Sequence, residues 1–211
     1  MIKSIMKILI GTPIHQVKDY SMEKWLKNVA KLKLEYSADL FMVDNSPGTE
    51  YMETVKGYCT KYGITNYKIV HIDFDQGMSV NTKDKRIETA QKIIREEVLS
   101  HDYDAWFSWE CDQIIPVDAL NKLVELMNIY GVMMVAANSW ARNNPAEFNP
   151  DMGVTLIAKE CLEKHGFLLK GDTDWQGNDR WFKERVLKAG GNYIDVYGVI
   201  SPIYHLDKLP D

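Results

Sequence analysis

Two acidic residues follow directly after an apolar, aromatic segment of the chain. The segment 104–109 reads DAWFSW, and it is followed by Glu110, Cys111 and Asp112. This pattern predicts a buried strand, and two carboxylates at its carboxyl end would repel each other unless they shared a cation. A divalent ion such as Mg²⁺ or Mn²⁺, which favours oxygen ligands, would relieve the repulsion and could bridge two phosphates. Two solvated acids without a functional role are the alternative interpretation.

Elements that could position these acids alternate along the first half of the chain. Short apolar runs and longer amphipathic stretches follow one another, as expected where crossover helices connect strands in an α/β fold. Ser21 is assigned as the N-cap of the first helix. The predicted strands are 7–11, 39–43, 67–74, 104–109 and 131–137, and the predicted helices are about 21–36, 50–62, 83–99 and 116–130. Together they form a Rossmann-like half.

The second half of the chain is more irregular. It contains an Asn- and Pro-rich segment and a polar loop, at 143–151 and 170–177. Its predicted elements are an apolar stretch at 153–158, helices at 159–165 and 179–189, and a late strand at 193–199. Because no flexible linker or repeat separates the halves, we interpret 1–211 as one domain. About 1–115 would bind a nucleotide and a metal, and about 116–211 would bind something else.

Composition excludes several classes of protein. The 211 residues include 45% hydrophobic and 26% charged residues, as in an ordinary globular protein, and the net charge of −5 argues against binding to nucleic acid phosphates. No apolar run reaches the roughly 18 to 20 residues that cross a bilayer, and Lys3 and Lys7 interrupt the first apolar segment, so we expect neither a membrane span nor a signal peptide. Three cysteines without a CxxC pair favour a reducing compartment, which we take to be the cytoplasm. Strand alternation turns Cys111 away from its acidic neighbours, which assigns it to packing.

Several segments resemble the GT-A glycosyltransferases that use nucleotide sugars, particularly those of family 2. The resemblance begins with KILIGTPIH and LFMVDNSPG at the first two strands, and it reaches WFSWECDQI where the family carries its DxD motif. It continues in GVTLIAKECLEKHGF and in QGNDRWFKERVLKAG, which is similar to the helix on the acceptor side. Glu110 replaces the first acid of DxD, and Asn178 stands where Glu is common. The resemblance implies a GT-A fold with a mixed central sheet flanked by helices, and transfer of a sugar from a nucleoside diphosphate sugar to an acceptor hydroxyl.

The resemblance also implies which residues bind the donor. Thr12 and Pro13 would line the nucleotide pocket, and Asp44 would hydrogen-bond the base or the ribose. Arg86 corresponds to a basic residue that faces the diphosphate in related enzymes, and Glu110 belongs to the same donor site. The alternatives are a turn in which Asp44 bonds its own backbone, and a solvated position for Arg86 among neighbouring charges.

Two residues are expected to hold Mn²⁺ or Mg²⁺. Asp112 is the first, because the last acid of the motif is the one that usually contacts the metal in the family. His205, in the segment IYHLD, is the second, since many GT-A enzymes use a histidine near the C-terminus and imidazole is compatible with Mn²⁺. A structural role is the alternative for His205, and His15 and His71 have weaker cases.

Asp179 is expected to be the catalytic base. It would take the proton of the acceptor hydroxyl as that oxygen attacks the anomeric carbon, which predicts inversion. The metal would neutralise the leaving diphosphate, so that no second protein acid is required. Asn178 and Trp175 are assigned to the acceptor and the sugar, Trp175 by stacking. The alternatives are an acid that favours the helix dipole at Asp179, and a buried ring that anchors its loop at Trp175.

Two other functions remain open at this point. A nucleotidyltransferase would share the fold and the acidic site, but it would need a Gly-rich, basic loop after the first strand, and GTPIHQVKD contains one glycine. A non-catalytic nucleotide-sugar-binding protein would account for the changes at Glu110 and Asn178. An active enzyme would take a nucleoside diphosphate sugar and a glycan, lipid or protein acceptor, with contact to a membrane surface left open. The base and the sugar of the donor are not predicted.

Overall fold

The computed structural model describes residues 6–73, 83–137, 140–141, 144–148, 152–166 and 178–207. Seven strands of these residues form a central sheet in the order β10-β6-β9-β4-β1-β2-β3. Their bounds are β1 (Lys7–Ile14), β2 (Ser37–Asp44), β3 (Tyr67–His71), β4 (Ala105–Trp109), β6 (Met134–Ala137), β9 (Val154–Ala158) and β10 (Tyr193–Val196). Parallel pairs join β1 to β2 and β4, β2 to β3, and β6 to β10, while β9 lies antiparallel between β4 and β6. The mixed α/β sheet confirms the predicted fold class.

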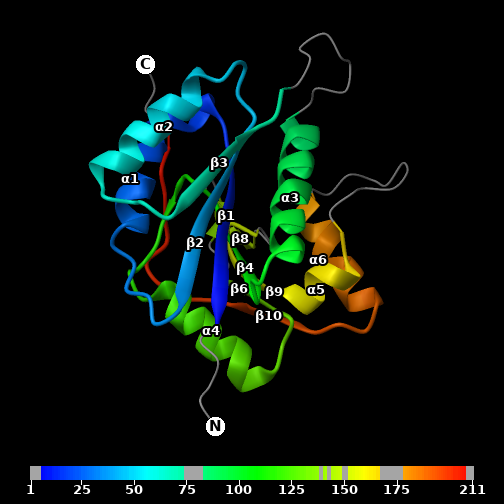
Figure 1. The fold of residues 1–211 in the computed structure, drawn as a ribbon. Coiled ribbons are helices and arrows are strands. Elements are labelled where there is room, and N and C mark those ends of the chain that lie inside the picture. Colours follow the sequence, from blue (N-terminus) through cyan, green and yellow to red (C-terminus); the bar gives the residue numbers. More distant parts are fainter. Residues whose placement is uncertain are drawn as a thin grey trace.

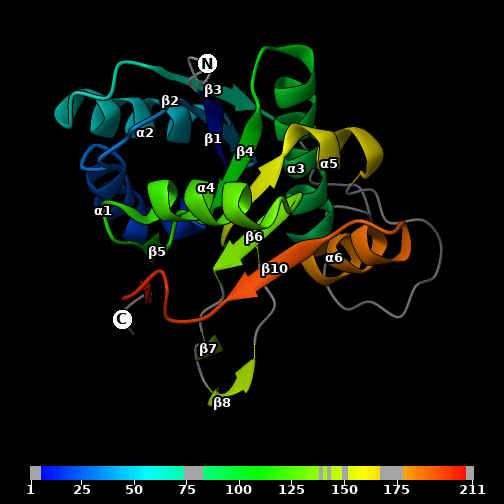
Figure 2. The same cartoon turned by 90° about the horizontal axis from the view of Figure 1, so that it is seen from below.

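Helices cover both faces of this sheet (Figures 1 and 2). One face packs against α1 (Asp19–Val29), α2 (Glu50–Lys61) and α4 (Ala119–Tyr130), and the other against α3 (Lys83–Ser100), α5 (Lys159–Lys164) and α6 (Asn178–Lys188). Strand β1 serves both faces, because Ile8 and Ile10 belong to the first core and Leu9 to the second. A strand buried on both sides is apolar at successive positions, which explains the continuous run ILI at 8–10.

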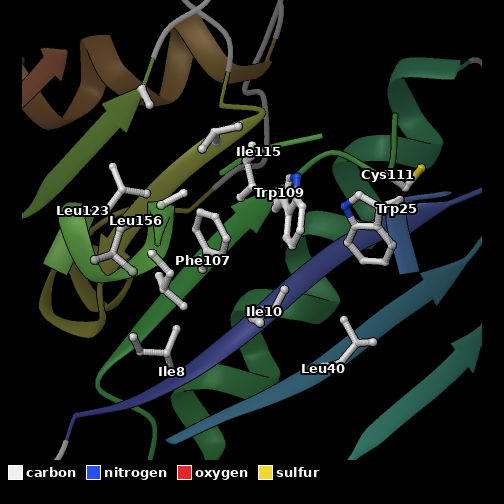
Figure 3. Close-up of a cluster of buried hydrophobic side chains, with 14 of the residues drawn as sticks. Ile8, Ile10, Trp25, Leu40, Phe107, Trp109, Cys111, Ile115, Leu123 and Leu156 are labelled. Atoms are coloured by element: carbon white, nitrogen blue, oxygen red, sulfur yellow. The ribbon is translucent and has the colours of Figure 1, made fainter. Parts of the chain in front are cut away.

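Aromatic packing anchors the end of β4. The Trp109 ring meets the Trp25 ring of α1 edge-on, with 5.1 Å between ring centroids, and both residues are fully buried. Figure 3 shows this pair beside Cys111, with Phe107 further along the same strand. The indole Nε1 of Trp109 donates to the carbonyl of Gln113 at 2.9 Å, so that the core also fixes the turn that follows the strand.

The described residues include four short strands outside the central sheet, and the sequence pattern predicted none of them. The strand β5 (Gln113–Ile114) pairs antiparallel with β11 (Tyr204–His205), and β7 (Trp140–Ala141) pairs with β8 (Asn144–Phe148). The first pair brings the C-terminal segment to the acidic turn after β4.

The first helix differs from its prediction at both ends. Helix α1 begins at Asp19, after a single turn η1 (Gln16–Lys18), and it ends at Val29. The expected N-cap, Ser21, instead lies inside the helix, where its hydroxyl donates to the carbonyl of Lys18 at 2.7 Å. The assignment of Ser21 as N-cap was therefore wrong.

Contacts with the start of α4 explain the early end of α1. The backbone amide of Lys33 donates to the carbonyl of Val117 at 2.8 Å. The side chain of Asn121 donates to the carbonyl of Lys33 at 2.7 Å and accepts from the amide of Glu35 at 3.2 Å. These bonds hold the backbone of 33–35 away from the helix, which overrides the helical pattern of 30–36.

The other predicted elements are present with shifted ends. The strand predicted at 67–74 ends at His71, the helix predicted at 116–130 begins at Ala119, and the strands predicted at 131–137 and 193–199 are Met134–Ala137 and Tyr193–Val196. Position 74 lies outside the described residues. Pro116 stands in a turn before its helix, because its carbonyl accepts from the amide of Ala119 at 3.1 Å. Among the helices that the structure describes, none is both long and apolar enough to cross a bilayer.

Candidate functional site

The acidic segment forms a tight turn at the carboxyl end of β4. The amide of Glu110 donates to the carbonyl of Gly153 at 2.8 Å, and the amide of Gln113 donates to the carbonyl of Glu110 at 3.1 Å. The end of an apolar strand was predicted here, and the structure confirms it. Parallel strands β1, β2, β3 and β4 end at the same edge of the sheet, where open α/β sheets bind ligands.

Asp112 is buried in this turn and already has a cation beside it. Its side chain is 4% exposed, and its Oδ2 lies 3.1 Å from Nζ of Lys18. The hydroxyl of Tyr20 donates to the same oxygen at 3.4 Å. Burial lowers the pKa of Lys18, but the negative charges of Glu110 and Asp112 outweigh burial, so that this pKa is raised and the amine is protonated at neutral pH. A buried carboxylate requires such compensation.

Glu110 is held in place by a neighbouring amide. Gln113 is 1% exposed, and its Nε2 donates to Oε2 of Glu110 at 3.3 Å. A Cβ atom at Gly153 would overlap the Gln113 amide, so the absence of a side chain at Gly153 leaves the room that Gln113 occupies. Gln113 thus positions one acid of the pair, a role that the sequence did not reveal.

The segment of His205 lies beside the acidic turn, as the proposed metal site requires. His205 pairs with Gln113 in the β5–β11 ladder, and the amide of Leu206 donates to the carbonyl of Asp112 at 2.8 Å. The structure therefore brings together the backbones of the two residues that were expected to bind a metal. Their role as ligands stays a prediction.

The side chains near this turn include donor types that a divalent ion accepts, but the described residues do not arrange them as a metal site. Carboxylate oxygens of Asp112 and Glu110, with the imidazole of His205, are ligands that Mn²⁺ accepts, and the ammonium of Lys18 marks a place where Asp112 binds positive charge. Within the described part of the chain, no group of three or more His, Cys, Asp or Glu side chains is arranged to hold a metal. An ion would therefore complete its coordination with water and with oxygens of a substrate, as Mg²⁺ commonly does.

Asp44 lies at the end of β2 with both carboxylate oxygens engaged. It is fully buried, and Oδ1 accepts from the amide and the hydroxyl of Ser46 at 3.0 and 2.6 Å. Oδ2 lies 3.0 Å from Nδ1 of His71, at the end of β3. The hydroxyl of Ser46 in turn accepts from the amide of Gln16 at 2.8 Å. The turn considered as the alternative for Asp44 is therefore present, and a direct bond from Asp44 to a base or ribose stays a prediction.

The other residues predicted to bind the donor lie at the end of β1 and on α3. Thr12 is buried, and its hydroxyl donates to the carbonyl of Pro13 at 3.3 Å. Burial lowers the pKa of His15, and the positive charge of Arg86 lowers it further, against an opposing effect of Asp44. The charge of Arg86 on α3 thus acts on His15, and the role of Arg86 at the diphosphate stays a prediction.

Cys111 packs into the core, as predicted. It is 1% exposed, and burial raises the pKa of its thiol to about 12. A thiol that stays protonated is not a metal ligand. Figure 3 shows it beside Trp25.

Two of the residues predicted to lie on the acceptor side fall at the start of α6. Asn178 and Asp179 occupy its first turn, where a helix was predicted from 179. Their side chains, and Trp175 as a whole, lie outside the described residues. Further along α6, the buried ammonium of Lys183 donates to Asp195 of β10 at 2.9 Å, which fixes the helix on the sheet.

Comparison with known proteins identifies the fold. No protein-family model matches the chain, and a search of curated proteins finds no match. Among solved structures, the mannosyltransferase PcManGT from Pyrobaculum calidifontis, in complex with GDP-Man and Mn²⁺, superposes with a TM-score of 0.69 at 14% identity, over 93% of this chain and 56% of that one. The chain has a GT-A-like glycosyltransferase fold.

A second solved structure of this fold is that of TarS from S. aureus. It matches with a TM-score of 0.66 at 11% identity, over 92% of this chain and 35% of TarS. TarS 1-349 in complex with UDP-GlcNAc gives a TM-score of 0.60 at 11% identity, over 84% of this chain and 52% of that one. The chain thus spans between about a third and a little over half of these structures, which share its GT-A-like fold.

Proposed function

We propose that this chain is a glycosyltransferase that moves a sugar from a nucleoside diphosphate sugar to an acceptor hydroxyl, with the help of a divalent ion and with inversion. One observation carries the proposal. Asp112, a buried acid at the carboxyl end of a central strand of a GT-A-like fold, pairs with the ammonium of Lys18 and lies beside the segment of His205. Solved proteins of this fold hold GDP-Man with Mn²⁺, or UDP-GlcNAc.

The donor would bind across the carboxyl ends of β1, β2 and β4. Thr12 and Pro13 would line the nucleotide pocket, and Asp44, through its bonds to Ser46 and His71, would fix the end of β2 against the base or ribose. Arg86 would face the diphosphate from α3, where its charge already acts on the end of β1.

Asp112 and His205 would hold the ion, with Glu110 beside them. A bound Mn²⁺ or Mg²⁺ supplies positive charge that neutralises the diphosphate as it leaves. Gln113 keeps Glu110 at the edge of this site, and the β5–β11 ladder keeps His205 there.

Asp179 would act as the base on the acceptor side. Its carboxylate takes the proton of the acceptor hydroxyl, whose oxygen forms a bond to the anomeric carbon. The bond from that carbon to the diphosphate breaks, and its electron pair leaves with the diphosphate oxygen. Attack from the face opposite the leaving group inverts the anomeric centre. Asn178 and Trp175 would contact the acceptor and the sugar.

The acceptor would be a glycan, a lipid or a protein. The three cysteines are free and buried, which fits a reducing compartment, and we place the enzyme in the cytoplasm.

The proposal is tested by incubating the protein with UDP-, GDP- and dTDP-sugars and Mn²⁺ and measuring the nucleoside diphosphate released. We expect release from donors of one base, stimulated by an acceptor and abolished by EDTA. A donor that binds but is never turned over would instead identify the non-catalytic binding protein.

A further inference from the structure

We propose that Lys18 competes with the metal ion for Asp112. The ammonium of Lys18 occupies the cation position on this carboxylate, and a divalent ion binds only as the Lys18 side chain moves away. This inference rests on the metal site of the proposed function. According to this proposal, the Lys18 side chain lowers the affinity of the site for a divalent ion.

The geometry places the ammonium of Lys18 at the carboxylate that the proposed metal ion would use. Nζ of Lys18 lies 3.1 Å from Oδ2 of Asp112, and the Asp112 side chain is 4% exposed beneath Lys18 and Tyr20. A small divalent ion binds oxygen at about 2 Å, so an ion on either carboxylate oxygen would stand within a few ångströms of the ammonium. Like charges at that separation repel strongly at a site shielded from water. Metal and ammonium therefore exclude each other.

Lys18 can leave without disturbing the backbone. Its amide donates to the carbonyl of His15 at 2.9 Å, and its carbonyl accepts from the hydroxyl of Ser21 at 2.7 Å, so the main chain is fixed by groups other than the ammonium. The side chain itself is 32% exposed. Rotation about the bonds of this long, flexible side chain is enough to move the charge into solvent.

The competition defines how the charge of Asp112 is compensated before a metal ion binds. While Lys18 is paired with Asp112, the buried carboxylate is compensated and the turn is stable without a metal. When a diphosphate brings its own negative charge to the site, the displaced ammonium has a new partner nearby. Metal binding is therefore expected to be weak alone and strengthened by the nucleotide.

Direct titration of Mn²⁺ without nucleotide, followed by electron paramagnetic resonance of the free ion, tests the competition. Lys18→Met should bind Mn²⁺ about tenfold more tightly than the wild type, a change intermediate between the measured effects of exposed and buried ion pairs. Lys24→Met is the matched control: it removes the same charge from an exposed position of α1, and its affinity should equal that of the wild type. Lys18→Arg keeps a cation on Asp112 and should keep the weak affinity.

An equal or lower affinity in Lys18→Met than in Lys24→Met would overturn the competition. If Lys18→Met loses its cooperative unfolding transition, the Mn²⁺ affinity is measured instead on Lys18→Gln, which removes the charge but keeps a polar group at the position. Asp112→Asn separates this inference from the proposed site. If Asp112→Asn binds Mn²⁺ as tightly as Lys18→Met, the metal site itself is misplaced. If Asp112→Asn loses Mn²⁺ while Lys18→Met matches its control, only the competition is wrong.

Discussion

His71 and Asp44 face each other at the ends of neighbouring parallel strands, with 3.0 Å between imidazole Nδ1 and carboxylate Oδ2. The Asp44 side chain is fully buried, whereas the His71 side chain is 13% exposed. In a neutral imidazole whose Nδ1 donates to the carboxylate, the other ring nitrogen is an acceptor. The contact with Asp44 therefore fixes the orientation of the His71 ring, which lies at the edge of the proposed nucleotide pocket.

Replacing His71 should destabilise the fold through Asp44. In His71→Ala the buried carboxylate loses one partner, which should lower the free energy of unfolding by about 1–3 kcal/mol. Urea denaturation measures this change. His101→Ala is the control, because His101 is exposed, and it should change the stability by no more than about 0.5 kcal/mol. Equal losses in the two variants would show that the Asp44–His71 contact contributes nothing.

A methyl group at Gly153 should weaken the acidic turn. In Gly153→Ala the new Cβ displaces the Gln113 amide, which releases Glu110 and costs about 1–3 kcal/mol through overpacking. Mn²⁺-dependent nucleotide binding should weaken in parallel, as titration calorimetry would show. Gly57→Ala on α2 meets open space and should stabilise by about 0.5–1 kcal/mol, because alanine favours a helix. A Gly153→Ala protein as stable as the wild type would contradict the assigned role.

Stability should fall in mild acid because of His165. Burial lowers the pKa of His165, and the positive charges of Arg185 and Lys164 lower it further. The stability from a neutral His165 is fully present above the unfolded-state pKa of about 6.5, and it is lost as the pH falls toward the lower pKa of the folded state. The free energy of unfolding, measured by urea denaturation between about pH 8 and pH 5, should therefore fall more steeply for the wild type than for His165→Gln. Parallel pH profiles of the two proteins would refute this assignment.

Removal of the proposed base should separate chemistry from binding. Asp179→Asn should reduce sugar transfer by about 10²- to 10⁴-fold, the usual contribution of a general base, and leave nucleotide affinity unchanged. Transfer assays and calorimetry on the same preparation measure both quantities. Near-normal turnover in this variant would remove Asp179 from the mechanism and, with it, the basis for predicting inversion.

The strands and their polar ends could be predicted from the sequence because each is a short apolar run closed by a turn. The apolar run before Glu110 predicted β4, and the apolar run before Asp44 predicted β2. Parallel strands end at one edge of a sheet, and Asp44 and Glu110 do follow neighbouring strands on either side of β1 at that edge.

Contacts between distant segments account for what the sequence did not reveal. The two-residue strands β5 and β11 are too short for a periodic pattern, although they bring His205 to Asp112. Asn121 ends the first helix by binding Lys33 and Glu35, and no local signal marks that contact. Lys18 looked like one of many surface lysines, because its pairing with Asp112 depends on the packing of α1 against the turn.

The central claim is that Asp112 belongs to a metal-dependent donor site. Calorimetric titration of UDP, GDP and dTDP into wild-type protein and Asp112→Asn, each with Mn²⁺ and with EDTA, tests it most directly. The account predicts that one nucleotide binds the wild type with Mn²⁺, that EDTA removes this binding, and that Asp112→Asn binds weakly in both conditions. Absence of binding by all three nucleotides, or equal Mn²⁺-dependent binding by the variant, would contradict the account.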